Sequence, residues 1–197
     1  MTHETFERSS TQQPLVLRAL EELIGSHQEE SGPLRILSVG CGSGILDNQL
    51  IASIASASRS FQYTGVDPNP VACHRFQESF DTLALKNVEL ELKVQGVEAL
   101  DINEPFDIIQ LTHALYYFRD PADTLEKLRN LLAPNGKLIM VHAPNEHLNQ
   151  LSECFWSHHV DHDIWFSDRL DEHLVQENMD FTRYRIRGEV DVTQCFE

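Results

Sequence analysis

A short apolar run that ends in three closely spaced glycines constrains the fold of this chain more than any other feature. Residues 34–39 are apolar enough for a buried strand, and the sequence Gly-Cys-Gly-Ser-Gly follows at residues 40–44. Glycine adopts backbone angles that other residues resist, and it leaves the chain bare where a ligand must approach closely. From residue 45 onward, apolar side chains recur at helical spacing. The pattern predicts a strand, a glycine loop and a helix, with a nucleotide-like ligand at the loop.

The rest of the chain alternates between two kinds of pattern. Apolar residues at helical spacing predict helices, and short apolar or alternating runs predict strands. The helices are expected over residues 15–24, 45–54, 71–84, 121–132 and 166–178. The further strands are expected over residues 61–66, 88–94, 106–111, 137–142 and 181–192.

Strands that alternate with helices of this length are typical of an α/β fold. Connections of this kind are right-handed, so we expect a Rossmann-like, doubly wound, mostly parallel sheet of about six strands with helices on both faces. The chain has 197 residues and shows no internal repeat or linker. Residues 1–197 are therefore expected to form a single domain.

Charge and cysteine content exclude several classes of partner. With 31 acidic against 15 basic residues, the net charge is −16, which repels nucleic acid and anionic lipid and would attract a small cation. Acidity that serves only solubility is the plainer explanation. No apolar run approaches the roughly 18 residues of a membrane span, and the N-terminus does not have the pattern of a signal peptide. The four cysteines form no Cys-x-x-Cys pair, so we expect a cytoplasmic protein with reduced thiols.

A carboxylate at the end of the second predicted strand narrows the ligand class. Asp67 lies 23 residues beyond Gly44, where it can accept both hydroxyl protons of a ribose. The dinucleotide fingerprint requires Gly or Ala at its sixth position, but this chain has Ile45, whose side chain would obstruct a pyrophosphate. The pattern favours S-adenosylmethionine over NAD. A tight turn without a ligand is the alternative.

The chain resembles the class I S-adenosylmethionine-dependent methyltransferases. The motifs Leu-Ser-Val-Gly-Cys-Gly-Ser-Gly, Gly-Val-Asp-Pro, Phe-Asp-Ile-Ile and Leu-Leu-Ala-Pro-Asn-Gly-Lys-Leu stand in the family's order at residues 37–44, 65–68, 106–109 and 131–138. The resemblance implies methyl transfer with S-adenosylmethionine as the cofactor. The candidate cofactor-binding residues are Gly40, Cys41, Gly42, Gly44, Asp67, Pro68, Gln95, Gly96 and Thr112.

Residues 114–120 and 190–196 are similar to segments of the histamine N-methyltransferases. In that family a Gln and Tyr residues after the fourth strand line the amine pocket, and His113, Tyr116 and Tyr117 stand at the matching positions. A carboxylate that holds the substrate ammonium is matched by Gln12, which has no charge to strengthen its hydrogen bonds. The resembling enzymes also continue past this chain's end and add a last antiparallel strand. The resemblance implies a small amine or imidazole substrate.

His113, Tyr116 and Tyr117 are the candidate catalytic residues. Methyl transfer from a sulfonium is an in-line displacement, so placement of the acceptor nitrogen does most of the catalysis, and His113 could receive the departing proton. Tyr116 and Tyr117 follow the end of a central strand, where ligands bind in such folds. The candidate substrate-binding residues are Gln12, His113, Tyr117, Trp156 and Trp165.

Trp156 and Trp165 bracket a segment that is rich in histidine and aspartate. Their rings could stabilise a cationic amine and a sulfonium, with core packing as an equally weighted alternative. His158 and His162 stand four residues apart, yet no further ligand appears at a recognised spacing. No metal site is expected.

The leading hypothesis from the sequence is an S-adenosylmethionine-dependent N-methyltransferase whose partner is a small, histamine-like amine or imidazole. A methyltransferase for another small molecule is one alternative. A cofactor-binding pseudoenzyme or truncated isoform without turnover is another, because Gln12 replaces a carboxylate and the family's tail is missing. An NAD-dependent oxidoreductase is the third, and Ile45 argues against it. Assembly as a homodimer is left open.

Overall fold

The computed structural model describes residues 10–27, 32–57, 60–102, 104–146, 149–150, 153 and 160–189. These residues contain a five-stranded sheet in the order β3-β2-β1-β4-β5, and every neighbouring pair of strands is parallel. The strands are β1 (Leu34–Val39), β2 (Phe61–Val66), β3 (Val88–Lys93), β4 (Phe106–Thr112) and β5 (Leu132–Val141).

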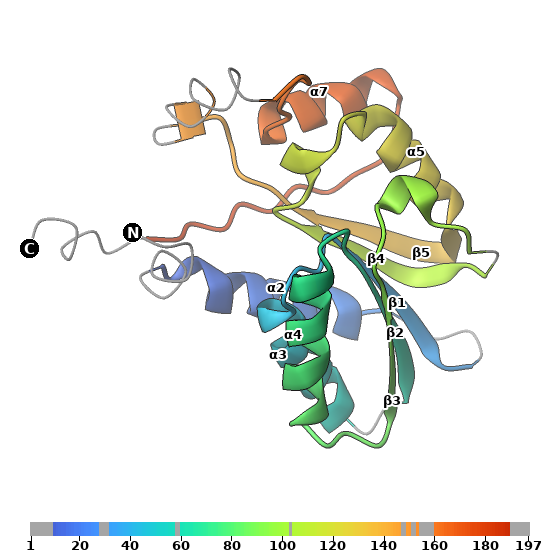
Figure 1. Cartoon of the computed structure of the whole chain (residues 1–197). Helices are drawn as coiled ribbons and strands as arrows, with labels where there is room; N and C mark the ends of the chain where they lie inside the picture. The colour runs from blue at the N-terminus through green and yellow to red at the C-terminus, as the bar shows by residue number, and fades with distance from the viewer. Residues whose placement is uncertain are drawn as a thin grey trace, which may run out of the picture.

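Helices cover both faces of the sheet, as expected (Figure 1). One face carries α2 (Gln12–Gly25), α3 (Ile45–Ser56) and α4 (Pro70–Asp81), and the other carries α5 (Pro121–Asn130) and α7 (Ser167–Gln176). Two single 3₁₀ turns, η1 (Val97–Ala99) and η2 (Leu115–Tyr117), follow β3 and β4. No helix among the described residues is long and apolar enough to cross a membrane.

Alternation along the central strands divides the core into two halves. Ile36 of β1 packs with the helices of the first face, whereas the next residue, Leu37, packs with α5 and α7. Successive side chains of a strand point to opposite faces, so a strand buried on both sides is apolar throughout. The strand order reverses between β1 and β4. In sheets of this kind, ligands bind at that switch point, outside the carboxyl ends of the strands.

Two sequence expectations about the sheet need correction. A sixth strand was expected over residues 181–192. Residues 181–189 form no strand, so the prediction is wrong there, and residues 190–192 lie outside the described residues. The alternation there comes from arginines that stay exposed and pair with acids on neighbouring segments. The fifth strand begins at Leu132, before the expected start at Lys137. Leu132 pairs with Phe106, the register then shifts, and the next pair is Ile108 with Lys137.

A buried polar cluster joins the start of α3 to the sheet beneath the glycine loop. The Tyr63 hydroxyl and the Gln110 amide donate to Asp47 Oδ1 at 2.6 and 3.2 Å. Gln110 also donates to the Tyr63 oxygen at 2.7 Å. Burial raises the pKa of the Asp47 carboxyl above its usual value, and the hydrogen bonds oppose this only in part. The folded protein therefore holds the Asp47 proton more tightly than the unfolded chain does.

We expect Asp47→Asn to stabilise the protein increasingly as pH rises. The native state holds the Asp47 proton more tightly than the unfolded chain, so wild-type stability falls as pH rises from the ordinary carboxyl pKa of about 4 towards the raised pKa. Asparagine keeps an acceptor oxygen at this position but does not titrate, so the stability of Asp47→Asn should not fall with pH in this way. Urea unfolding between pH 5 and pH 8 measures it, and parallel curves for the two proteins would contradict the assignment. The control Asp47→Leu removes the acceptor as well and should be about 1 to 3 kcal/mol less stable than Asp47→Asn at every pH.

Candidate functional site

The three glycines after β1 all have left-handed backbone angles, with φ of 70° at Gly40, 54° at Gly42 and 70° at Gly44. A Cβ on Gly40 would lie 2.6 Å from the Cβ of Ala114, and one on Gly44 would overlap the ring of Phe76. Nothing lies within 4 Å of the corresponding position on Gly42. The outer glycines therefore allow tight packing, while Gly42 presents open backbone at the switch point.

Asp67 ties the end of β2 to the glycine loop. Its Oδ2 accepts from the Gly42 N–H and its Oδ1 from the Asn69 N–H, both at 2.9 Å. A carboxylate has about four lone-pair positions, so both oxygens can still accept from a diol. The Asn69 side chain caps α4, with Pro70 in its first turn.

Cys41 contributes to the loop through its backbone. Its N–H donates to the Val66 carbonyl at 3.3 Å, and its side chain is 7% exposed and faces the position where Gly65 would carry a Cβ. Burial raises the pKa of the Cys41 thiol far above its ordinary value, so the side chain stays a neutral, packed thiol. Any contact with a ligand would come from the main chain.

The other cofactor candidates stand at the carboxyl ends of β2, β3 and β4. Thr112 ends β4, and its Oγ1 is buried with no hydrogen-bond partner among the described residues. Gly96 precedes η1, and Gln95 donates from its side-chain amide to the Ala99 carbonyl at 3.2 Å. Pro68 is exposed directly after Asp67. An orphan hydroxyl, open glycine backbone and a tip carboxylate at one sheet edge fit an adenosyl ligand.

Gln12, His113 and Tyr116 form a hydrogen-bonded chain beside this edge. The Gln12 side-chain nitrogen lies 3.0 Å from His113 Nε2, and His113 Nδ1 lies 3.3 Å from the Tyr116 hydroxyl. Since the amide nitrogen can only donate, His113 Nε2 accepts and Nδ1 carries the hydrogen. The Tyr116 oxygen also accepts from the Ala143 N–H at 2.6 Å. His113 has a left-handed φ of 53°, which its N–H bond to the Val141 carbonyl helps to hold.

His142 completes the cluster, and the sequence analysis missed it. Its ring stacks on Tyr116 with centroids 4.1 Å apart, and its Nε2 lies 2.6 Å from the Trp165 carbonyl. A carbonyl only accepts, so Nε2 carries the hydrogen. Burial lowers the pKa of His142 to about 4. Its position directly after the last residue of β5, at the same edge as His113, is the signal that could have identified it.

The rings of the remaining aromatic candidates differ in their exposure. Tyr117 is 69% exposed, with its ring perpendicular to that of Tyr116. Trp165 is only 8% exposed and packs against His173 and below the Arg169 guanidinium, both on α7. Core packing therefore accounts for the Trp165 ring. Trp156 lies outside the described residues.

The acidic segment before α7 is held by ion pairs. Asp161 pairs with Arg119, and Asp163 pairs with Arg169 at 2.9 Å. These pairs and Trp165 line a cavity of about 720 Å³ at the start of α5. Within the part of the chain that the structure describes, no three His, Cys, Asp or Glu residues come together as metal ligands, and His158 lies outside that part.

We expect the His142 ring to stay neutral down to about pH 5, because its burial disfavours the charged form. Between the ordinary pKa of 6.5 and the folded value of about 4, the unfolded chain binds the proton more readily, so stability contributed by this residue is lost as pH falls through that window. The ring Cε1 shift in a ¹H–¹³C titration measures the midpoint, and His142→Phe assigns the resonance. A midpoint at pH 6 or above would contradict the buried, neutral ring.

Comparisons with known proteins identify the family of this chain. A model of the methyltransferase domain matches residues 7–185. The highly reducing polyketide synthase verA of Penicillium polonicum is 26% identical over 156 residues, covering 74% of this chain and 6% of the synthase. Histamine N-methyltransferase of Xenopus tropicalis is 24% identical over 201 residues, covering 88% of this chain and 64% of that enzyme. The chain thus spans less than two thirds of either relative's length.

A solved structure shows the same fold. The N-methyltransferase NodS from Bradyrhizobium japonicum WM9, in complex with S-adenosyl-L-homocysteine, matches with a TM-score of 0.57 at 19% identity, covering 81% of this chain and 73% of that chain. At this low sequence identity, the structural match shows the fold alone. The match to the methyltransferase-domain model covers most of the sequence, over residues 7–185. The chain therefore belongs to the methyltransferase-domain family.

Proposed function

We propose that this chain transfers a methyl group from S-adenosylmethionine to a nitrogen of a small, histamine-like amine or imidazole compound. One contact carries the proposal. Gly40 of the glycine loop packs so closely on Ala114 that a Cβ would lie 2.6 Å away, and Ala114 directly follows His113. The loop that would hold the cofactor and the polar chain that would hold the acceptor therefore adjoin.

Backbone and carboxylate groups would hold the cofactor, which supplies an electrophilic methyl group when bound. Asp67 would accept the ribose hydroxyls, and the open face of Gly42 admits the ligand to the bare main chain. The orphan Thr112 hydroxyl is available to a polar group of the same ligand. Gln95 and Gly96 stand at the end of β3, where the far end of an elongated ligand would reach.

The acceptor side can handle the proton that methylation releases. His113 Nε2 accepts from the Gln12 amide, and that amide can turn to offer its oxygen instead once Nε2 takes a proton. The Tyr116 oxygen already accepts two hydrogen bonds, which leaves its own hydrogen to donate to a polar atom of the acceptor. Burial raises the pKa of Tyr116 to about 12, so it stays a donor at neutral pH.

The neutral character of this wall favours an acceptor that arrives uncharged. Gln12 and Tyr116 are polar but carry no charge, and His142 is held neutral, so an imidazole suits them better than a tight ammonium ligand would. One relative is named for histamine methylation and another is a polyketide synthase, so the family match alone leaves the acceptor open. The net charge of −16 would still draw weakly basic molecules to the protein. The free thiols of Cys41 and Cys73 support a cytoplasmic setting.

We expect Asp67→Ala to weaken binding of S-adenosylmethionine at least tenfold, because it removes charge-assisted hydrogen bonds worth about 1.5 to 3 kcal/mol each. Calorimetric titration of the folded variant measures the loss. Asp81→Ala is the matched control, since Asp81 is an exposed aspartate at the opposite end of α4. Equal affinity of wild type and Asp67→Ala would remove Asp67 from the cofactor site.

We expect labelled methyl transfer from S-adenosylmethionine to at least one imidazole or amine in a panel that includes histamine. His113→Asn should lower kcat about 100-fold, the lower end of the usual effect of a proton acceptor. Asparagine tolerates the left-handed backbone, so the variant removes the ring without straining the turn. Cofactor affinity should not change. A protein that binds the cofactor but methylates nothing in the panel would contradict the proposed acceptor class.

A further inference from the structure

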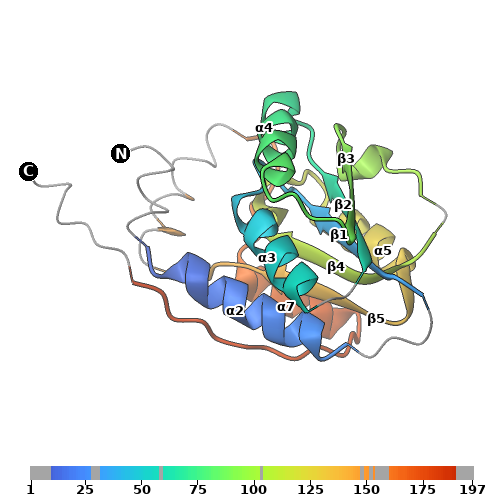
Figure 2. The ribbon, with the colours of Figure 1, turned by 90° about the horizontal axis from the view of Figure 1, so that it is seen from below.

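Residues 181–189, here called the strap, run from the end of α7 back to the start of α2 without joining the sheet (Figures 1 and 2). The strap is exposed along most of its length, and only Ile186 packs against the first half of the core. Burial of apolar surface does not account for the path of the strap, because a single apolar contact contributes little to holding an extended segment in place.

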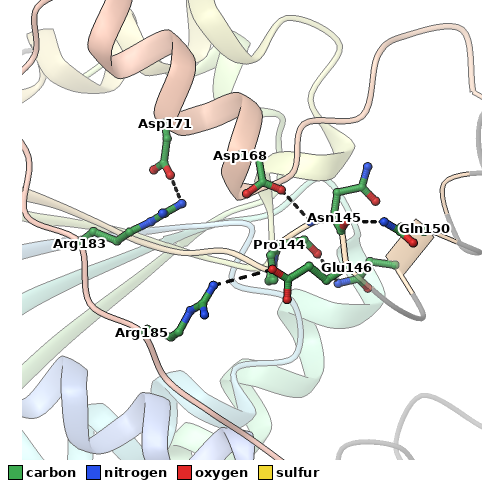
Figure 3. A network of polar contacts seen from close by, with 9 residues as sticks. Pro144, Asn145, Glu146, Gln150, Asp168, Asp171, Arg183 and Arg185 are labelled. Atoms are coloured by element: carbon green, nitrogen blue, oxygen red, sulfur yellow. Dashed lines mark hydrogen bonds and ion pairs between the residues drawn. The ribbon is translucent and has the colours of Figure 1, made fainter.

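Arginines attach the first half of the strap to the carboxyl edge of the fold (Figure 3). Arg183 pairs with Asp171 of α7, and Arg185 lies 3.8 Å from Glu146 in the segment after β5. That segment is in turn tied to α7, because Asp168 accepts from the Asn145 N–H at 3.1 Å. Exposed ion pairs contribute little to stability, but together they fix the direction in which the strap leaves α7.

The second half of the strap is attached to the residue before Gln12. The Thr11 N–H donates to the Glu189 carbonyl at 2.9 Å, and the Glu189 N–H donates to the Thr11 hydroxyl at 2.8 Å. Threonine before a helix commonly uses its hydroxyl to cap that helix, yet Thr11 makes no side-chain cap bond to α2. The hydroxyl is used on the strap instead.

Gly188 lets the strap touch Gln12 itself. A Cβ at this position would lie 2.9 Å from the Cβ of Gln12 and 3.1 Å from its Cα, closer than real Cβ atoms pack. A glycine where another backbone approaches closely is the usual solution to such a contact. The Gln12 main chain is thus held between the strap and the Ser10 hydroxyl, which accepts its N–H at 3.1 Å.

We propose that the strap positions Gln12 for its hydrogen bond with His113, which makes Gly188 and Thr11 positioning residues of the acceptor site. Gln12 begins α2, and the first turn of a helix has no hydrogen-bonded turn before it to hold it. The strap supplies that support through Thr11 and Gly188. The link to acceptor methylation rests on the function proposed above, whereas the effect on the His113 ring does not.

The test compares Gly188→Val with Gly25→Ala, whose added Cβ meets nothing within 4 Å at the other end of α2. In protein labelled with ¹⁵N-histidine, the ring-nitrogen shifts of His113 should change in Gly188→Val, because Nε2 loses its amide partner, and should stay as in wild type in Gly25→Ala. Cofactor affinity should remain within twofold. kcat/KM for the acceptor should fall at least tenfold.

If Gly188→Val does not fold, a second pair of variants tests the same proposal. Thr11→Val removes the hydroxyl at nearly constant volume, and Thr11→Ser retains it, so only the valine variant should alter the His113 shifts. Unchanged His113 shifts in a folded Gly188→Val or Thr11→Val protein would overturn the proposal. Altered shifts without any methylation in wild type would keep the positioning role and refute the proposed function alone.

Discussion

The hydrogen bond from the Gly42 N–H to the Asp67 carboxylate is the contact on which the functional edge depends. It joins the ends of two neighbouring parallel strands and holds a left-handed loop in one shape. The close packing of Gly40 on Ala114 carries this geometry across the switch point to the turn that presents His113. These two contacts would fix the proposed cofactor site and the proposed acceptor site relative to each other.

Burial disfavours the charged forms of three groups near this edge. Burial raises the pKa of the Asp47 carboxyl below the glycine loop and that of the Cys41 thiol, and it lowers the pKa of the His142 ring to about 4. A neutral wall costs less to desolvate than a charged one. The arrangement matches a reaction that depends on placement more than on a strong acid or base.

The features that the sequence could predict are those set by short-range rules. Three glycines after a strand, an aspartate at the next strand tip and an Asn-Pro helix start each impose a local conformation, and the structure has all three. The alternating sequence pattern of residues 181–189 predicted a strand wrongly, because the same period arises from arginines that pair with acids outside a sheet. The contact between Gln12 and His113 joins residues 101 positions apart, so periodicity could not reveal it. His142 was missed because a lone histidine after a strand differs from a surface residue only by its burial.

We propose that the carboxyl edge from β1 to β4 holds the cofactor next to the Gln12, His113 and Tyr116 chain. A ¹H–¹⁵N correlation spectrum of the full chain, titrated with S-adenosylhomocysteine, tests it most directly. We expect the largest shifts at Gly42, Asp67, Gly96 and Thr112, with His113 next, and no change at the far ends of α3 and α4. No saturable shifts, or shifts confined to the cavity at the start of α5, would contradict it.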